Sequence, residues 1–222
     1  MAHTRHSARI SYCSESGTPV RHAVPPLNSM QRICVFCASN PGHNPAYLAL
    51  ARTLGVLMAE RKHTVVFGGG RVGLMGALAD AALGAGGEVI GVMPHALVQR
   101  EAAHRQLTKL YIVDTMHERK AMLAELSDGF IAMPGGIGTL EELFETWTWG
   151  HLGVHTKPIA LLDVADYWKS LVVFLDHMGQ EGFMRPNTRE LLLIDTDAPR
   201  LLDQMRTYVA PPVTQWLRLS QT

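Results

Sequence analysis

From residue 32 onward, short apolar runs alternate with longer amphipathic stretches. The apolar runs have the length of buried strands, and the stretches between them have the three- and four-residue apolar spacing of helices. The predicted strands are 33–39, 63–69, 88–94, 109–115, 129–135, 158–164 and, with the weakest pattern, 191–197. The predicted helices are about 45–61, 73–85, 116–127, 139–152, 166–179 and 198–208. Nearly continuous apolar strands, each followed by a helix, predict an α/β fold with a parallel sheet covered on both faces.

This alternation predicts one Rossmann-like domain, a doubly wound parallel sheet, over residues 31–210. Residues 1–30 are polar and basic and end near the pair Pro25-Pro26, so we expect a flexible N-terminal extension there. Residues 211–222 are expected to form a C-terminal tail.

Composition narrows the range of partners. Hydrophobic residues make up 47% of the 222 residues, and the 20 Lys and Arg balance the 20 Asp and Glu. A dedicated nucleic-acid-binding protein usually has a clear basic excess. No apolar run approaches the ~20 residues of a membrane span, and residues 1–30 lack the long apolar core of a signal peptide. We therefore expect a cytoplasmic protein that binds neither nucleic acid nor membranes, while a small anionic substrate remains compatible with this neutral chain.

The sequence offers three weak metal signals. Cys34 and Cys37 have C-x-x-C spacing, but on a strand residues three apart point to opposite faces, so we expect buried, reduced thiols rather than a zinc site or a disulfide. His151 and His155 are four apart, but Gly153 between them indicates a helix end. The pair formed by Glu101 and His104 is equally weak. No metal and no cofactor are expected.

In doubly wound sheets, ligands bind beyond the carboxyl ends of the strands. This rule selects Ser39, Gly69, Gly70 and Met93 as ligand contacts, together with the segment 134–139. The turn "GGGRVGLMG" (68–76) also satisfies the dinucleotide pattern G-x-G-x-x-G. However, it follows the second strand, and Met93 stands where an acidic residue should bind a ribose hydroxyl. A dinucleotide is therefore disfavoured, although the glycines still bring backbone amides close to a ligand.

The segment "MPGGIGTLEE" (133–142) is the better phosphate site. Gly135, Gly136 and Gly138 let the backbone approach an oxyanion, and the helix expected from about Thr139 presents unpaired amides and its positive dipole end. No Walker lysine follows, so the pattern favours a monophosphate over a nucleotide triphosphate.

Two charged residues, one at the end of this segment and one upstream of it, have two interpretations each. Glu142 lies three residues after Thr139, the spacing of a capping box, but it also lies off the apolar stripe, where it can face a bound ligand. Arg119 continues the apolar stripe of the helix 116–127 and therefore requires an anion. It forms either a structural salt bridge or, next to Lys120, part of the same cleft as Glu142.

At this point the sequence resembles the LOG ("lonely guy") family, the cytokinin riboside 5′-monophosphate phosphoribohydrolases formerly labelled lysine decarboxylases. "ERK" (118–120) with "PGGIGTLEE" (134–142) carries the resemblance, which extends over about 32–209 through "FCASN", "GGGRVGLMG", "GVMPHAL" and "TWTWGHLGVHTKPIALL". The family implies a Rossmann-like homodimer or higher homo-oligomer. It also implies hydrolysis of the N-glycosidic bond of adenosine-type 5′-monophosphates to free base and ribose 5-phosphate.

The resemblance also implies site residues, with Arg119 and Glu142 as the catalytic pair. The implied substrate contacts are Glu101, Arg119, Lys120, Gly135, Gly136, Ile137, Gly138, Thr139, Leu140, Glu141, Glu142 and Thr148. The chain departs from the commonest family pattern at Asn40, where serine is frequent, at Ile137, where tyrosine is frequent, and at Gln99-Arg100. None of these changes removes a catalytic group.

Three alternatives remain open at the level of sequence. A pyridoxal-phosphate decarboxylase would need a Schiff-base lysine, for which Lys120 is the candidate. A non-catalytic carrier, similar to the molybdenum-cofactor carrier proteins, would bind a phosphorylated ligand through the same glycines without needing the pair Arg119–Glu142. A scaffold built around Trp147 and Trp149 is compatible with catalysis.

Overall fold

The computed structural model describes residues 10–12, 30–98 and 103–212. Most of the predicted N-terminal extension and C-terminal tail therefore lies outside the described residues, as does Glu101. Of the extension, residues 10–12 form a short strand, β1, at the edge of the sheet next to β5.

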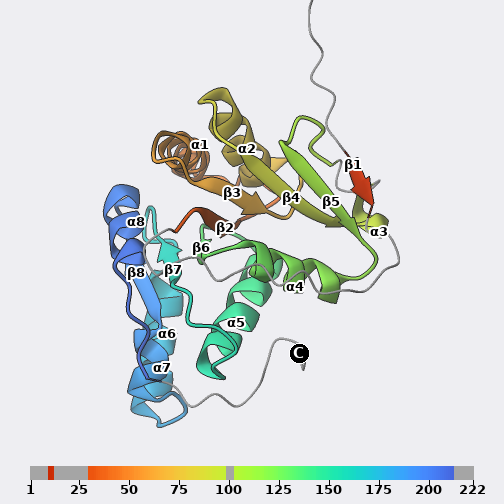
Figure 1. The fold of residues 1–222 in the computed structure, drawn as a ribbon. Helices are drawn as coiled ribbons and strands as arrows, with labels where there is room; N and C mark the ends of the chain where they lie inside the picture. Colours follow the sequence, from red (N-terminus) through yellow and green to blue (C-terminus); the bar gives the residue numbers. More distant parts are fainter. Residues whose placement is uncertain (1–9, 13–29, 99–102, 213–222) are drawn as a thin grey trace, which may run out of the picture.

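A single sheet of parallel strands runs through the middle of the molecule (Figure 1). Its order is β1-β5-β4-β3-β2-β6-β7-β8, and all seven predicted strands are present. The bounds are β1 (Ile10–Tyr12), β2 (Arg32–Phe36), β3 (Thr64–Phe67), β4 (Val89–Pro94), β5 (Lys109–Val113), β6 (Gly129–Ala132), β7 (Ile159–Leu162) and β8 (Leu192–Asp195). From β2 the chain adds β3, β4 and β5 on one side and then returns to add β6, β7 and β8 on the other. The order therefore reverses between β2 and β6, where such folds bind ligands.

Helices cover both faces of the sheet, as the alternating pattern predicts. One face packs against α1, α2 and α8, and the other packs against α4, α5 and α6. The bounds are α1 (Pro45–Glu60), α2 (Gly73–Gly84), α3 (His95–Val98), α4 (Met116–Leu126), α5 (Ile137–His151), α6 (Lys169–Gln180), α7 (Pro186–Glu190) and α8 (Ala198–Arg206). Among the helices of the described residues, only α3 and α7 were not predicted, because helices of four and five residues are too short to show an amphipathic period.

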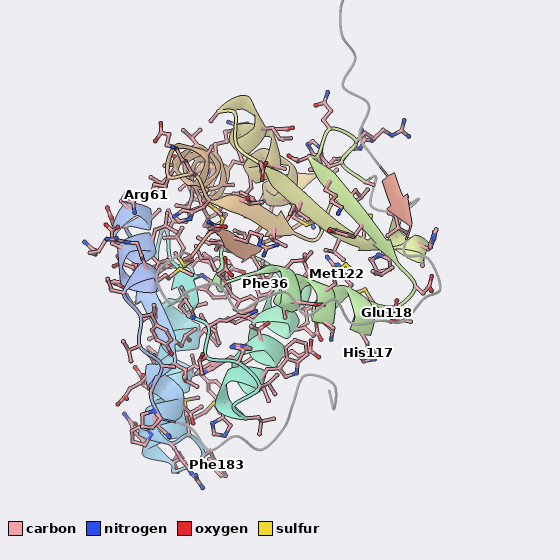
Figure 2. All side chains as sticks on the ribbon, in the orientation of Figure 1. Phe36, Arg61, His117, Glu118, Met122 and Phe183 are labelled. Carbon is pink, nitrogen blue, oxygen red and sulfur yellow. The ribbon has the colours of Figure 1, made fainter. Side chains whose placement is uncertain are left out.

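The central strand β2 contributes to both cores. Ile33 and Val35 pack on the face covered by α1 and α2, whereas Cys34 and Phe36 pack on the face covered by α4 and α5; Figure 2 labels Phe36 beside α4. Cys37 returns to the first face, so the two thiols lie on opposite sides of the sheet, as predicted. Both are free and buried, and burial raises the pKa of each thiol well above its usual value.

Candidate active site

The turns that follow β2, β3 and β6 are tied to one another by backbone hydrogen bonds. The Ala38 carbonyl accepts hydrogen bonds from the amides of Leu74 (3.0 Å) and Met75 (3.3 Å) in the first turn of α2. The Ala38 amide donates to the Pro134 carbonyl (3.3 Å). The turn after β2 is therefore fixed between the two glycine-rich turns, at the place where the strand order reverses.

Two glycines of the 68–76 turn make this arrangement possible. Gly73 has a φ of +61°, and a Cβ there would lie 2.3 Å from the Ser39 carbonyl carbon. A Cβ at Gly68 would lie 2.0 Å from Nη2 of Arg119. The glycines of this turn thus create room for the neighbouring loop and for a guanidinium, which is a different role from that of a dinucleotide fingerprint.

Helix α5 begins earlier than the sequence predicts. Its N-cap is Gly136, which makes no side-chain cap, and its first residue is Ile137. Thr139 is therefore the third helical residue, buried against Gly135. Glu142 lies in the second turn, so the interpretation of Thr139 and Glu142 as a capping box is wrong. Two glycines around the helix start allowed the backbone to become helical before the first residue with a capping side chain.

The start of α5 is open on the side where a ligand would bind. A Cβ built at Gly136 or Gly138 meets no atom within 4 Å, and Ile137 between them is 85% exposed. The first amides of a helix have no partner within the helix, and the dipole adds positive potential there. An oxyanion can therefore approach this turn without obstruction by side chains.

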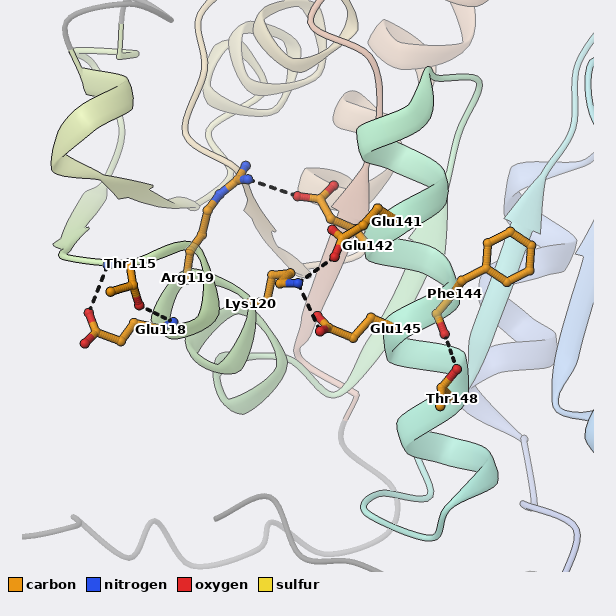
Figure 3. A network of polar contacts seen from close by, with 9 residues as sticks. All are labelled: Thr115, Glu118, Arg119, Lys120, Glu141, Glu142, Phe144, Glu145 and Thr148. Atoms are coloured by element: carbon orange, nitrogen blue, oxygen red, sulfur yellow. Dashed lines mark hydrogen bonds and ion pairs between the residues drawn. The ribbon is translucent and has the colours of Figure 1, made fainter. Parts of the chain in front are cut away.

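A real capping box occurs instead at the start of α4. The Thr115 hydroxyl accepts a hydrogen bond from the Glu118 amide (3.1 Å), and Glu118 Oε2 accepts one from the Thr115 amide (3.3 Å). Glu118 Oε2 also accepts a hydrogen bond from the Asp114 amide (2.8 Å). These contacts fix the first turn of α4, from which Arg119 projects toward the strand ends (Figure 3).

Arg119 and Glu142 form a nearly buried ion pair. Nη1 of Arg119 lies 3.2 Å from Oε1 of Glu142, and the two side chains are only 9% and 12% exposed. Nε of Arg119 donates to the Val92 carbonyl at 3.2 Å. After burial, the negative charge of Glu142 is the main factor that raises the pKa of Cys37 beneath it. The structure therefore joins the two predicted catalytic residues directly, at the mouth of the glycine-rich turns.

Lys120 makes a second link between the same helices. Its Nζ lies 2.5 Å from Oε1 of Glu141 and 3.0 Å from Oε1 of Glu145 (Figure 3). Burial by itself lowers the pKa of Lys120, but hydrogen bonds to the two carboxylates outweigh it, and the net effect is a raised pKa. This amine is therefore held in its charged form.

Other predicted contacts lie apart from this pair. Met93 is fully buried in the core, and Leu140 is partly buried against the other core cluster. Thr148 lies further along α5, where its hydroxyl donates to the Phe144 carbonyl (2.7 Å). It lines a pocket of about 490 Å³ formed by α5, α6, α7 and the segment between α6 and α7. By contrast, Arg119 and Glu142 contact each other, and Glu142 belongs to α5, the helix that begins directly after Gly136.

Two contacts of the site were not predicted. The Val92 carbonyl that binds Arg119 belongs to the backbone and carries no signal in the sequence. Tyr167 follows β7 and donates a hydrogen bond from its hydroxyl to the Gly135 carbonyl. The strand-end rule could have selected Tyr167, because β7 is the neighbour of β6 in the sheet.

The two histidines of the pair His151 and His155 have other partners. Nδ1 of His151 lies 2.9 Å from the Thr188 hydroxyl, and Nε2 of His155 lies 3.1 Å from the Thr146 carbonyl. Burial and the charge of Lys157 lower the pKa of His155 to about 4. Among residues 10–12, 30–98 and 103–212, no three His, Cys, Asp or Glu side chains gather where they could bind a metal. Within these ranges no helix is long and apolar enough to cross a membrane.

Comparison with known proteins finds similar proteins over most of the described chain. A protein-family model described as "Possible lysine decarboxylase" matches residues 75–205. A cytokinin riboside 5′-monophosphate phosphoribohydrolase from Rhodococcoides fascians is 46% identical over 176 residues, which cover 79% of this chain and 89% of that protein. One from Arabidopsis thaliana is 42% identical over 182 residues, which cover 82% of this chain and 85% of that protein.

Solved structures with this fold have more distant sequences. The molybdenum cofactor binding protein from Rippkaea orientalis aligns with a TM-score of 0.61 at 20% identity, covering 81% of this chain and 97% of that chain. The molybdenum cofactor carrier protein from Chlamydomonas reinhardtii gives a TM-score of 0.59, also at 20% identity, covering 81% of this chain and 100% of that chain. At this identity the likeness concerns the fold alone.

Proposed function

This chain belongs to the LOG family, and from that premise we propose that it hydrolyses the N-glycosidic bond of adenosine-type nucleoside 5′-monophosphates. The products would be the free base and ribose 5-phosphate. AMP and N6-prenylated AMP are the two substrates to compare, since the names of the relatives specify a cytokinin riboside 5′-monophosphate.

The observation that carries this proposal is the nearly buried pair Arg119–Glu142 beside an open helix start. Glu142 lies between one and two turns from Gly136 along α5, and Nη1 of Arg119, from α4, is 3.2 Å from its Oε1. A 5′-phosphate bound by the amides of 136–139 would place the ribose over the first turns of α5. The glycosidic carbon would then face the carboxylate of Glu142.

The reaction needs a water molecule and no redox partner. Cleavage breaks the bond between C1′ and the base nitrogen; the hydroxyl of water adds to C1′, and its proton balances the departing base. The ribose becomes cationic as the bond breaks, and a carboxylate in a site that excludes water stabilises such a charge. In this place Glu142 has three candidate tasks: stabilising the ribosyl cation, orienting the water or binding a ribose hydroxyl.

Arg119 would support this chemistry in two ways. Its guanidinium is 3.2 Å from Glu142 and favours the ionised carboxylate. Its positive charge would also offset the negative charge of a bound phosphate. The bond from its Nε to the Val92 carbonyl fixes the guanidinium plane, so the charge has a defined position before substrate binds.

The older description of the family as a lysine decarboxylase fits these residues less well. A Schiff base forms from a neutral amine, whereas Lys120 is bound by two carboxylates and its pKa is raised. The carrier alternative has weaker support too, because a carrier does not require the pair Arg119–Glu142.

We also propose that the chain forms a homodimer or a higher homo-oligomer. The support is an apolar surface at the far end of α5, α6 and α7. Phe144 and Phe183 line the pocket there and are exposed, at 37% and 84%, while Trp147 forms its buried wall (Figure 2). Large exposed apolar residues that gather in this way are typical of interfaces. Light scattering on the wild type and on Phe183→Ser would test this; a wild-type mass of 24.4 kDa in solution would contradict it.

The direct test of function is base release. The purified protein is incubated with AMP and with isopentenyladenosine monophosphate, beside the Glu142→Ala variant, and free base is followed by chromatography. We expect the wild type alone to release base, and the preferred nucleotide identifies the substrate. Binding of both nucleotides without release of base would reject hydrolysis in favour of the carrier alternative.

A further inference from the structure

The loop after β7 reaches across to the glycine-rich turn after β6. The two strands are neighbours in the sheet and run parallel, so their following loops, 163–168 and 133–136, leave the same edge side by side. Tyr167 makes the contact, donating a hydrogen bond from its hydroxyl to the Gly135 carbonyl.

This loop has an unusual backbone. Ala165 and Asp166 both have a φ of +55°, in the left-handed region that side chains other than glycine rarely adopt. On the two sides of this pair, the loop is held by backbone hydrogen bonds and by the Trp168 amide, which donates to Oδ1 of Asp163 at 3.1 Å. Consecutive residues in strained conformations persist only where their surroundings hold them, and such sites are often functional.

The consequence of this backbone is the position of the Tyr167 ring. The ring packs edge-on against Tyr47, with centroids 5.5 Å apart, and edge-on against Trp168, with centroids 4.8 Å apart. Trp168 is only 2% exposed, so one side of this stack is anchored in the core. The hydroxyl is therefore presented to Gly135 in a fixed direction.

We infer that Tyr167 is a positioning residue for the phosphate site. The Gly135 carbonyl and the Gly136 amide belong to one planar trans peptide, in which the C=O and the N–H point in opposite directions. Fixing the carbonyl toward Tyr167 therefore fixes the amide away from it. Around Gly136 a Cβ would meet no atom within 4 Å, so this amide lies at the open start of α5. Tyr167 thus aims a phosphate-binding amide without touching the phosphate.

This inference rests on the proposed function, because it assigns the 136–139 turn to a phosphate. It adds a residue outside the glycine-rich motif and outside the pair Arg119–Glu142. It also specifies the effect: Tyr167 should matter for ligands that carry the phosphate and be neutral for ligands that lack it.

The test compares Tyr167→Phe with Tyr47→Phe, a tyrosine of the same stack that leaves the Gly135 contact intact. Calorimetry measures binding of ribose 5-phosphate and of adenosine, which lacks the phosphate. We expect Tyr167→Phe to weaken ribose 5-phosphate binding about three- to tenfold, the usual effect of one hydrogen bond, and to leave adenosine binding unchanged. With AMP, its KM should rise by a similar factor while kcat stays within about twofold. Tyr47→Phe should match the wild type.

Two results would overturn the inference. Unchanged ribose 5-phosphate affinity in Tyr167→Phe would remove the link between the hydroxyl and the phosphate site. Parallel losses for ribose 5-phosphate and adenosine, with a lower melting temperature, would make Tyr167 merely structural. Failure of the wild type to release base from AMP would instead reject the proposed reaction, and the calorimetry would still decide the role of Tyr167.

Discussion

Two consecutive cations of α4, Arg119 and Lys120, form ion pairs with three carboxylates of α5. Arg119 meets Glu142, while Lys120 meets Glu141 and Glu145. The first pair is almost enclosed, at 9% and 12% exposure, whereas the glutamates that bind Lys120 are 49% and 26% exposed. Neighbouring residues of a helix point about 100° apart, so Arg119 faces the strand ends and Lys120 faces the flank of α5.

This difference separates a pair suited to chemistry from a pair suited to holding helices together. A buried ion pair contributes little net stability, because desolvation offsets the attraction between its charges. Arg119 nevertheless has space made for it at Gly68 and a carbonyl partner at Val92. Lys120, with two carboxylates at the helix flank, is positioned to stabilise the packing of α4 on α5.

The largest expected effect is the loss of the Arg119 guanidinium. In Arg119→Met, Glu142 loses its cation and the site loses positive charge, so we expect kcat/KM for AMP to fall about 10²–10⁴-fold. Steady-state kinetics measure this fall, and circular dichroism checks that the variant is folded. Arg119→Lys, which keeps the charge without the fork of donors, should be folded and still impaired at least about tenfold. A fully active Arg119→Lys would show that the guanidinium geometry is unimportant.

A smaller effect is expected from crowding Arg119 without removing it. In Gly68→Ala the new Cβ would fall 2.0 Å from Nη2, so the guanidinium has to move away from Glu142. We expect kcat/KM to fall about 10–100-fold with little loss of stability. Gly84→Ala, where a Cβ meets no atom within 4 Å, is the matched control and should be fully active. Equal activity of the two variants would argue against a defined position for the guanidinium.

Replacing Lys120 should lower stability more than activity, the reverse of what we expect for the Arg119 variants. Lys120→Met breaks two charge-assisted hydrogen bonds, and we expect the free energy of unfolding to drop by about 1–3 kcal/mol. The effect on kcat should stay within about tenfold. Urea titration and steady-state kinetics on the same protein give both values. A kcat as low as that of Arg119→Met, at wild-type stability, would erase the distinction between the pairs.

The smallest expected effect is the change with pH in the stability that Lys120 contributes. Since the folded-state pKa of Lys120 is raised above its usual 10.5, its contribution to stability is complete below 10.5 and is lost as pH rises through the higher folded value. The stability difference between wild type and Lys120→Met should therefore be constant from about pH 6 to about pH 9 and shrink in stronger alkali. Urea titrations across this range measure it. A difference that changes near neutral pH would mean that another group controls the contact.

The sheet and its ligand-binding edge could be predicted from sequence because buried parallel strands are almost wholly apolar. Strand 158–164, for example, contains β7 at Ile159–Leu162, where all four residues are buried. The start of α5 could not be predicted equally well. Gly136 has no side chain that could cap the helix, so the prediction placed the N-cap at Thr139, whose hydroxyl could do so, and gave Glu142 a capping interpretation that the structure overturns.

The site was predictable to the extent that its residues lie within motifs. Arg119 stood out as a charge on an apolar stripe, and Glu142 as a carboxylate near a phosphate turn; the structure joins them at 3.2 Å. Contacts made by the backbone, such as the Val92 carbonyl, leave no trace in residue identity. Tyr167 follows β7, a strand end that the prediction did not select, and its specific contact with Gly135 depends on β6 and β7 being neighbours in the sheet.

The most direct test of this account is kcat of Glu142→Gln on AMP at saturating substrate, with Glu141→Gln as control. The substitution keeps the size of Glu142 and removes its charge, whereas Glu141 lies next to it on α5 and binds Lys120. We predict a fall in kcat of about 10²–10⁴-fold for Glu142→Gln and a change of less than about tenfold for Glu141→Gln. A kcat of Glu142→Gln within about threefold of the wild type would contradict the assignment of Glu142 to catalysis.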